Sequence, residues 1–135
     1  MSTTANRNDP VVVITGAGRG IGVSIAHSFA KAGSTLCLIA RSSPELEAVA
    51  QELIREYNIS VETWAADISD IAWVVSVAQE IETRHGRVDV LVNLLGPVVL
   101  TRTLLPCILQ QGTGTIISIG SRLCGGSAKY LSVEV

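Results

Sequence analysis

Short apolar runs alternate with longer amphipathic segments along most of this 135-residue chain. The first run, Val11–Thr15, is continuously apolar and β-branched up to its end, as expected of a strand buried on both faces. Alternating strands and helices predict parallel strands joined by right-handed crossovers, and therefore a doubly wound α/β sheet. Five strands are expected: Val11–Thr15, Thr35–Ala40, Val61–Ala65, Val88–Val92 and Thr115–Ile119.

The amphipathic segments carry signals for helix starts and stops. Ser43, Pro44 and Glu45 form a cap, a first-turn proline and a first-turn acid, and the apolar residues that follow have helical spacing. Four helices are expected: Gly20–Ala32, a segment from Ser43 to Tyr57, a segment capped by Ser69 or Asp70 that ends near His85, and Val98–Gln111 despite Pro106.

Composition narrows the class of protein without identifying it. The length suits one domain, which we expect at residues 11–135 behind a polar, flexible tail at residues 1–10. That tail lacks the apolar core of a signal peptide, and polar residues interrupt the most apolar stretch, residues 88–105. A net charge of −2 gives no electrostatic reason to expect nucleic acid or an anionic membrane as a partner. Three cysteines without a C-x-x-C pair suggest free thiols, so we expect a cytoplasmic protein.

A glycine-rich segment, Thr15–Gly22, lies between the first strand and the first helix with the pattern T-G-x-x-x-G-x-G. A helix N-terminus offers unpaired N–H groups and the positive end of a dipole, so a diphosphate can bind there. Glycine is needed where the backbone turns with positive φ or approaches the phosphates closely. The alternative is a glycine-rich turn without a ligand. The candidate contacts are Gly16, Arg19, Gly20, Ile21 and Gly22.

The loop pattern resembles that of the short-chain dehydrogenase/reductase family, which implies a Rossmann-like fold and a nicotinamide cofactor. In dinucleotide folds an acid at the end of the second strand holds the ribose 2′-hydroxyl. Here Ala40 stands at that position, and Arg41 follows it. Arg41 and Arg19 could attract a 2′-phosphate, so NADP(H) is expected rather than NAD(H), unless both are ordinary surface charges. Asp67 and Ile68 resemble the family pair that contacts adenine, although Asp67 could be a turn residue.

The resemblance changes at Asn93. Members of the family usually have Asn-Asn-Ala-Gly after the fourth strand, where this chain has Asn93-Leu94-Leu95-Gly96. The segment from Val92 to Pro97 also resembles a later family segment, in which a catalytic Asn lies in the helix before the fifth strand. An internal deletion joined at Asn93 would explain both matches.

The reactive end of the family is represented by Ser121, in the place of the catalytic serine, and by Tyr130, the candidate acid/base. The family has a lysine four residues after that tyrosine, on the same helix, where it lowers the tyrosine pKa. Here Glu134 has that spacing, and a negative neighbour disfavours the phenolate. The chain ends at Val135, so the resemblance covers about the first half of a member. A C-terminal truncation of this kind would leave the fifth strand as an exposed edge.

Three hypotheses about function follow. The first is an oxidoreductase that moves hydride between NADP(H) and a small alcohol or ketone, with Ser121, Tyr130 and Asn93 at the reacting end. The second is a catalytically inactive nucleotide-binding fragment, and the third is a degenerate product without stable function. No metal is expected, and the question of a homo-oligomer stays open because the usual dimer helices are partly missing.

Overall fold

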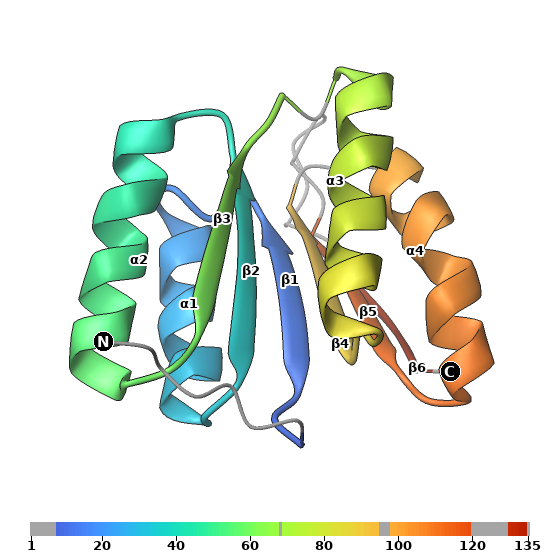
Figure 1. Cartoon of the computed structure of the whole chain (residues 1–135), viewed down its shortest axis with the longest axis horizontal. Coiled ribbons are helices and arrows are strands. Elements are labelled where there is room, and N and C mark those ends of the chain that lie inside the picture. Colours follow the sequence, from blue (N-terminus) through green and yellow to red (C-terminus); the bar gives the residue numbers. More distant parts are fainter. Residues whose placement is uncertain (1–7, 68, 95–97, 120–129, 135) are drawn as a thin grey trace.

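A six-stranded sheet in the order β3-β2-β1-β4-β5-β6 forms the centre of the molecule (Figure 1). The structure is a computed structural model that describes residues 8–67, 69–94, 98–119 and 130–134. The first five strands are parallel, which confirms the doubly wound α/β fold expected from the sequence. The strands are β1 Val11–Thr15, β2 Thr35–Ala40, β3 Val61–Ala65, β4 Val90–Leu94, β5 Thr115–Ile119 and β6 Tyr130–Glu134.

Helices cover the two faces of the sheet in pairs (Figure 1). On β1, Val11 and Val13 pack with the buried residues of α3 and α4, whereas Val12 and Ile14 pack with those of α1 and α2. This alternation explains why the first strand needs apolar residues at every position. Within the described residues, no helix combines the length and the apolar character that crossing a bilayer requires. The helices are α1 Ile21–Lys31, α2 Ser43–Tyr57, α3 Ile71–His85 and α4 Val98–Gln111.

Local hydrogen bonds determine where elements begin. Asp70, one of the two expected caps, is the N-cap of α3 and accepts a hydrogen bond from the Trp73 amide at 3.2 Å. The cap of α2 is Ser42, one residue before the expected Ser43. The strand β4 begins two residues later than expected, because Asp89 is held in the preceding turn. Its side chain accepts from the Val11 amide at 2.8 Å, and its own amide donates to the Val11 carbonyl at 2.9 Å.

The end of the chain corrects two expectations. Residues Tyr130–Glu134 form the strand β6, not part of a helix, and they pair antiparallel with β5, so β5 is not an exposed edge. The segment Tyr-Leu-Ser-Val-Glu has the two-residue alternation of a strand. A strand of this kind can pair with the outer N–H and C=O groups of β5, which would otherwise lack partners in the sheet.

Candidate functional site

The predicted nucleotide-binding residues gather at one edge of the sheet. Parallel strands bring their carboxyl ends to the same edge, so the glycine loop after β1, Arg41 after β2 and Asp67 after β3 are neighbours. The strand order also reverses direction between β1 and β4, because β2 and β3 lie on one side of β1 and β4 and β5 on the other. In open α/β sheets, ligands bind in the crevice at such a reversal.

The glycine loop takes a backbone path that requires glycine. Gly16 and Gly20 have φ values of 65° and 64°, in the left-handed region that other residues rarely adopt. Between them, the Ala17 amide donates to the Ile39 carbonyl at 3.2 Å and ties the loop to the end of β2. The loop is therefore held against both β1 and β2.

The first turn of α1 packs directly on the start of the loop. A Cβ atom added to Gly22 would lie 2.0 Å from the Gly16 carbonyl oxygen and 2.8 Å from the Gly16 carbonyl carbon. Only a residue without a side chain permits this approach, and Gly22 is buried. The third glycine of the pattern is therefore explained by helix–loop packing.

The N-terminus of α1 is open toward the loop. Gly20 is the N-cap and has no side chain to offer, and no side-chain cap of α1 occurs in the described part of the chain. The first N–H groups of a helix need acceptors from outside the helix, and together with the helix dipole they favour an anion. Exposed Ile21 follows Gly20, with 61% of its surface accessible. This geometry suits a phosphate group.

Two arginines lie at this edge of the sheet, Arg19 in the glycine loop and Arg41 directly after β2. Arg19 and Arg41 are exposed, and within residues 8–67, 69–94, 98–119 and 130–134 neither forms an ion pair. Asp67 accepts hydrogen bonds from the Ser69 amide at 3.0 Å and the Ser69 hydroxyl at 2.7 Å. These bonds lower the pKa of Asp67, and the nearby charge of Arg41 lowers it further, so Asp67 is an anion at neutral pH. Its expected neighbour in the site, Ile68, lies outside the described residues.

One charged residue at this edge was assigned only a structural role by the sequence. Glu45, in the first turn of α2, places its Oε2 atom 3.2 Å from the position that a Cβ of Gly18 would occupy. The sequence indicated that Glu45 is a first-turn acid but did not indicate that its side chain lies against the glycine loop. That contact depends on how the start of α2 packs against the loop that follows β1, which no local pattern reveals.

Asn93 lies in the strand β4 and not in a helix. It is only 2% exposed, and its Nδ2 donates to the hydroxyl of Thr101 on α4. Its Oδ1 is buried without a hydrogen-bond partner among the described residues. The amide therefore faces the α4 side of the sheet, and the predicted role of Asn93 in catalysis stays a prediction.

The remaining reactive residues are only partly placed. Ser121 lies outside the described residues. The backbone of Tyr130 pairs with Ile119 at the carboxyl end of β5, and this is the edge that also carries the glycine loop. The strands β4 and β5 separate Tyr130 from β1.

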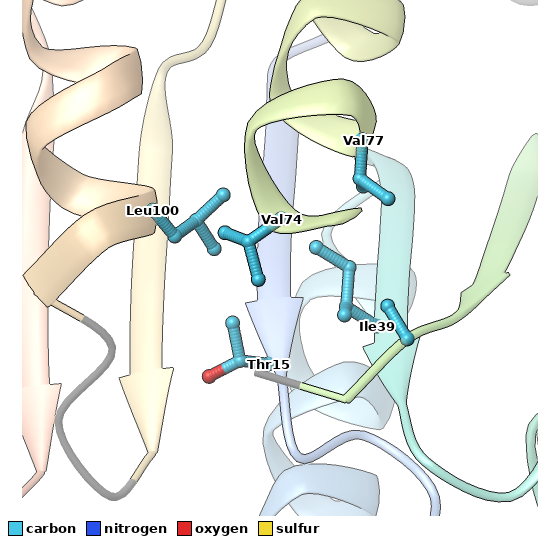
Figure 2. A pocket seen from close by; sticks show the side chains of 6 residues that line it. Thr15, Ile39, Val74, Val77 and Leu100 are labelled. Carbon is cyan, nitrogen blue, oxygen red and sulfur yellow. The ribbon is translucent and has the colours of Figure 1, made fainter. Parts of the chain in front are cut away.

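A small apolar cavity lies beneath this edge (Figure 2). Its volume of about 10 Å³ is close to the minimum that one water molecule needs, and among the described residues that line it only one hydroxyl could bind water. That hydroxyl, on Thr15, donates to the Val92 carbonyl at 3.4 Å. The cavity is therefore a gap in packing and not a ligand site. It is lined by Thr15, Ile39, Ala66, Val74, Val77 and Leu100.

Comparisons with a family model and with curated relatives point to the same protein family. Residues 10–96 match the family model described as short chain dehydrogenase. A relative from Danio rerio, "Dehydrogenase/reductase SDR family member 7B", is 34% identical over 146 residues, covering 86% of this chain and 47% of its own. The aligned stretch is longer than this chain, so it includes positions where the relative has residues that this chain lacks. The chain spans about half the length of the curated relatives that it matches.

Solved structures agree with the sequence comparison. A metagenomic short-chain oxidoreductase in complex with NADP superposes with a TM-score of 0.80 at 30% identity, over 93% of this chain and 66% of that one. L-sorbose reductase from Gluconobacter frateurii, complexed with NADPH and L-sorbose, superposes with a TM-score of 0.77 at 29% identity, over 87% of this chain and 54% of that one.

Proposed function

The chain belongs to the short-chain dehydrogenase family, and from this membership we propose that it binds NADP(H) at the carboxyl edge of its sheet. The proposal extends to an oxidoreductase activity in which hydride moves between NADP(H) and an alcohol or carbonyl substrate. The single observation that carries it is the glycine loop. There, two glycines with positive φ and the close packing of Gly22 on Gly16 leave the N-terminus of α1 open to a diphosphate.

The charges around the loop support the phosphorylated cofactor. Arg41 lies directly after β2, where the family position for an acid is filled by Ala40. Arg19 adds a second cation within the loop, and neither guanidinium is neutralised by an ion pair in the described part of the chain. A guanidinium can bind a phosphate through two parallel hydrogen bonds, so both are suited to a 2′-phosphate. The two solved structures named above hold NADP and NADPH.

At the reacting end, NADP(H) would supply or accept the hydride, and Tyr130 would exchange the proton with the substrate oxygen. Ser121 would donate a hydrogen bond to that oxygen, and Asn93 is the third candidate at this end. The substrate would be a small alcohol or ketone.

A second candidate function is nucleotide binding without turnover, and the position of Tyr130 favours it. Tyr130 lies on a strand, where the residue four positions later is roughly 13 Å away along the chain. That residue is Glu134, so the position holds a carboxylate and not the cation that would stabilise a phenolate. Buried Asn93 donates to Thr101 and so adds no amide to an open site.

Fluorescence titration of the purified chain with NADPH and NADH tests the cofactor proposal. We expect saturable binding of NADPH, and we expect Arg41→Ala to weaken it roughly tenfold while NADH binding changes little. Arg55→Ala is the matched control, because Arg55 is an exposed arginine in the last turn of α2, away from the loop. Absence of saturable binding by a folded sample would refute the proposal.

Consumption of NADPH with a panel of ketones then separates the two candidate functions. Turnover that is lost in Tyr130→Phe supports the oxidoreductase. Binding of NADPH without turnover supports the nucleotide-binding candidate.

A further inference from the structure

Glu45 occupies the corner where the glycine loop, the end of β2 and the start of α2 meet. The position of a Cβ on Gly18 would be 3.2 Å from Glu45 Oε2, 3.5 Å from Glu45 Cβ and 3.4 Å from Ala40 Cβ. All three elements therefore come together around one point of the loop. The Glu45 carboxylate is exposed at this point and forms no ion pair within the described residues.

The same corner must receive the 2′ position of a bound dinucleotide. When the diphosphate binds at the N-terminus of α1, the adenosine ribose reaches toward the end of the second strand, where its 2′ substituent is recognised. In this chain that place is Ala40, followed by Arg41. A phosphate on the ribose would therefore enter beside Arg41 and, on the loop side, beside the Glu45 carboxylate.

We propose that Glu45 tunes cofactor specificity, because its carboxylate repels the 2′-phosphate of NADP(H). The preference of the chain for NADP(H) over NAD(H) is therefore smaller than Arg19 and Arg41 alone would produce. The inference rests on the proposed function, because it concerns the same nucleotide site. A carboxylate repels a phosphate at short range but can accept a hydrogen bond from an unmodified ribose hydroxyl. Glu45 thus weakens the binding of NADP(H) and does not weaken the binding of NAD(H).

Two other features of the corner bear on this argument. Asp67 is also an anion close to Arg41, but its oxygen atom Oδ1 accepts hydrogen bonds from Ser69, which accounts for its position. Glu45 additionally lies in the first turn of α2, where a negative charge stabilises the helix through its dipole. That structural role would affect the stability of the chain and leave the ratio of the two cofactor affinities unchanged, so the ratio is the decisive readout.

The test compares dissociation constants for NADPH and NADH in the full chain and in Glu45→Gln, measured by fluorescence at low salt and at 0.5 M salt. We expect Glu45→Gln to tighten NADPH binding by roughly three- to tenfold and to leave NADH unchanged or weaker. The gain should shrink at about 0.5 M salt, because the repulsion is between exposed charges and is screened. Glu52→Gln is the matched control: it removes the same charge from α2, two helical turns further from the loop and beside His27.

The outcomes separate this inference from the function on which it rests. An increased preference for NADPH in Glu45→Gln, with Glu52→Gln like the unmodified chain, supports it. NADPH binding whose preference over NADH is the same in all three proteins overturns the role of Glu45 and leaves the proposed function standing. Failure of every protein to bind either dinucleotide overturns both.

Discussion

Replacing Gly22 with alanine should lower the stability of the chain and distort the proposed nucleotide site. The added Cβ would meet the Gly16 carbonyl oxygen at 2.0 Å and Ala17 Cα at 3.0 Å. An ordinary contact between carbon and oxygen is about 3.3 Å, so helix and loop must separate by more than about 1 Å. Because the obstacle is backbone, no side-chain rotation can relieve it.

The expected change in the free energy of unfolding combines two opposing effects. Overpacking of this kind costs about 1–3 kcal/mol, and the upper part of that range applies because backbone atoms are involved. Alanine in place of glycine returns up to about 1 kcal/mol of helix propensity. We therefore expect Gly22→Ala to lower the free energy of unfolding by about 2 kcal/mol, and to weaken NADPH binding because the loop is displaced.

Urea unfolding followed by tryptophan fluorescence measures the first effect, and NADPH titration of the folded fraction measures the second. Gly33→Ala is the control, because Gly33 has a φ of 86° with no atom near its Cβ position and lies at the far end of α1. It should cost about 1–2 kcal/mol of stability through backbone strain and leave NADPH affinity intact. Unchanged stability and affinity in Gly22→Ala would refute the packing argument.

Three further substitutions or treatments probe other parts of the structure. Asp70→Ala should lower the free energy of unfolding by about 1 kcal/mol in urea, since the α3 cap is lost; an unchanged midpoint would contradict this. Ser69→Ala should raise the pKa of Asp67 measured by carboxyl NMR. The Asp67 pKa is depressed by folding, so its contribution to stability is present above its unfolded pKa of about 3.9 and is lost as pH falls through the folded pKa. The stability difference between Ser69→Ala and the unmodified chain should accordingly disappear at acid pH, and a difference independent of pH would argue against the bond from the Ser69 hydroxyl. Burial raises the pKa of the Cys37 thiol, so mass spectrometry should find Cys37 unmodified by iodoacetamide until urea unfolds the chain; rapid native labelling would contradict its buried position.

The regular elements of the fold could be predicted because their signals are local. Val11–Thr15 needs apolar residues on both faces, and the cap at Asp70 and the glycine at Gly86 mark the ends of α3. The start of β4 was misplaced because the Asp89 carboxylate, and not an apolar pattern, determines where the strand begins. At Tyr130 only the family resemblance implied a helix, whereas the two-residue alternation of the segment itself is typical of a strand.

The backbone geometry of the proposed nucleotide site was predictable to the extent that the site is built from one loop and the residues that directly follow strands. The positive φ values at Gly16 and Gly20 agree with the reason given for those glycines. The contact between Glu45 and Gly18 depends on the packing of α2 against the loop, which spacing along the chain does not encode. The burial of Asn93 against Thr101 is a further tertiary effect, since it requires α4 to cover β4.

The most direct test of the central claim is an amide NMR titration of the isotope-labelled chain with NADPH. The account predicts that the amide resonances of residues 16–22 and of Arg41 shift in a saturable manner, while those at the opposite edge, such as Gly33 and Gly86, stay in place. Saturable shifts elsewhere without any change at residues 16–22, or no shifts at millimolar NADPH in a folded sample, would contradict it.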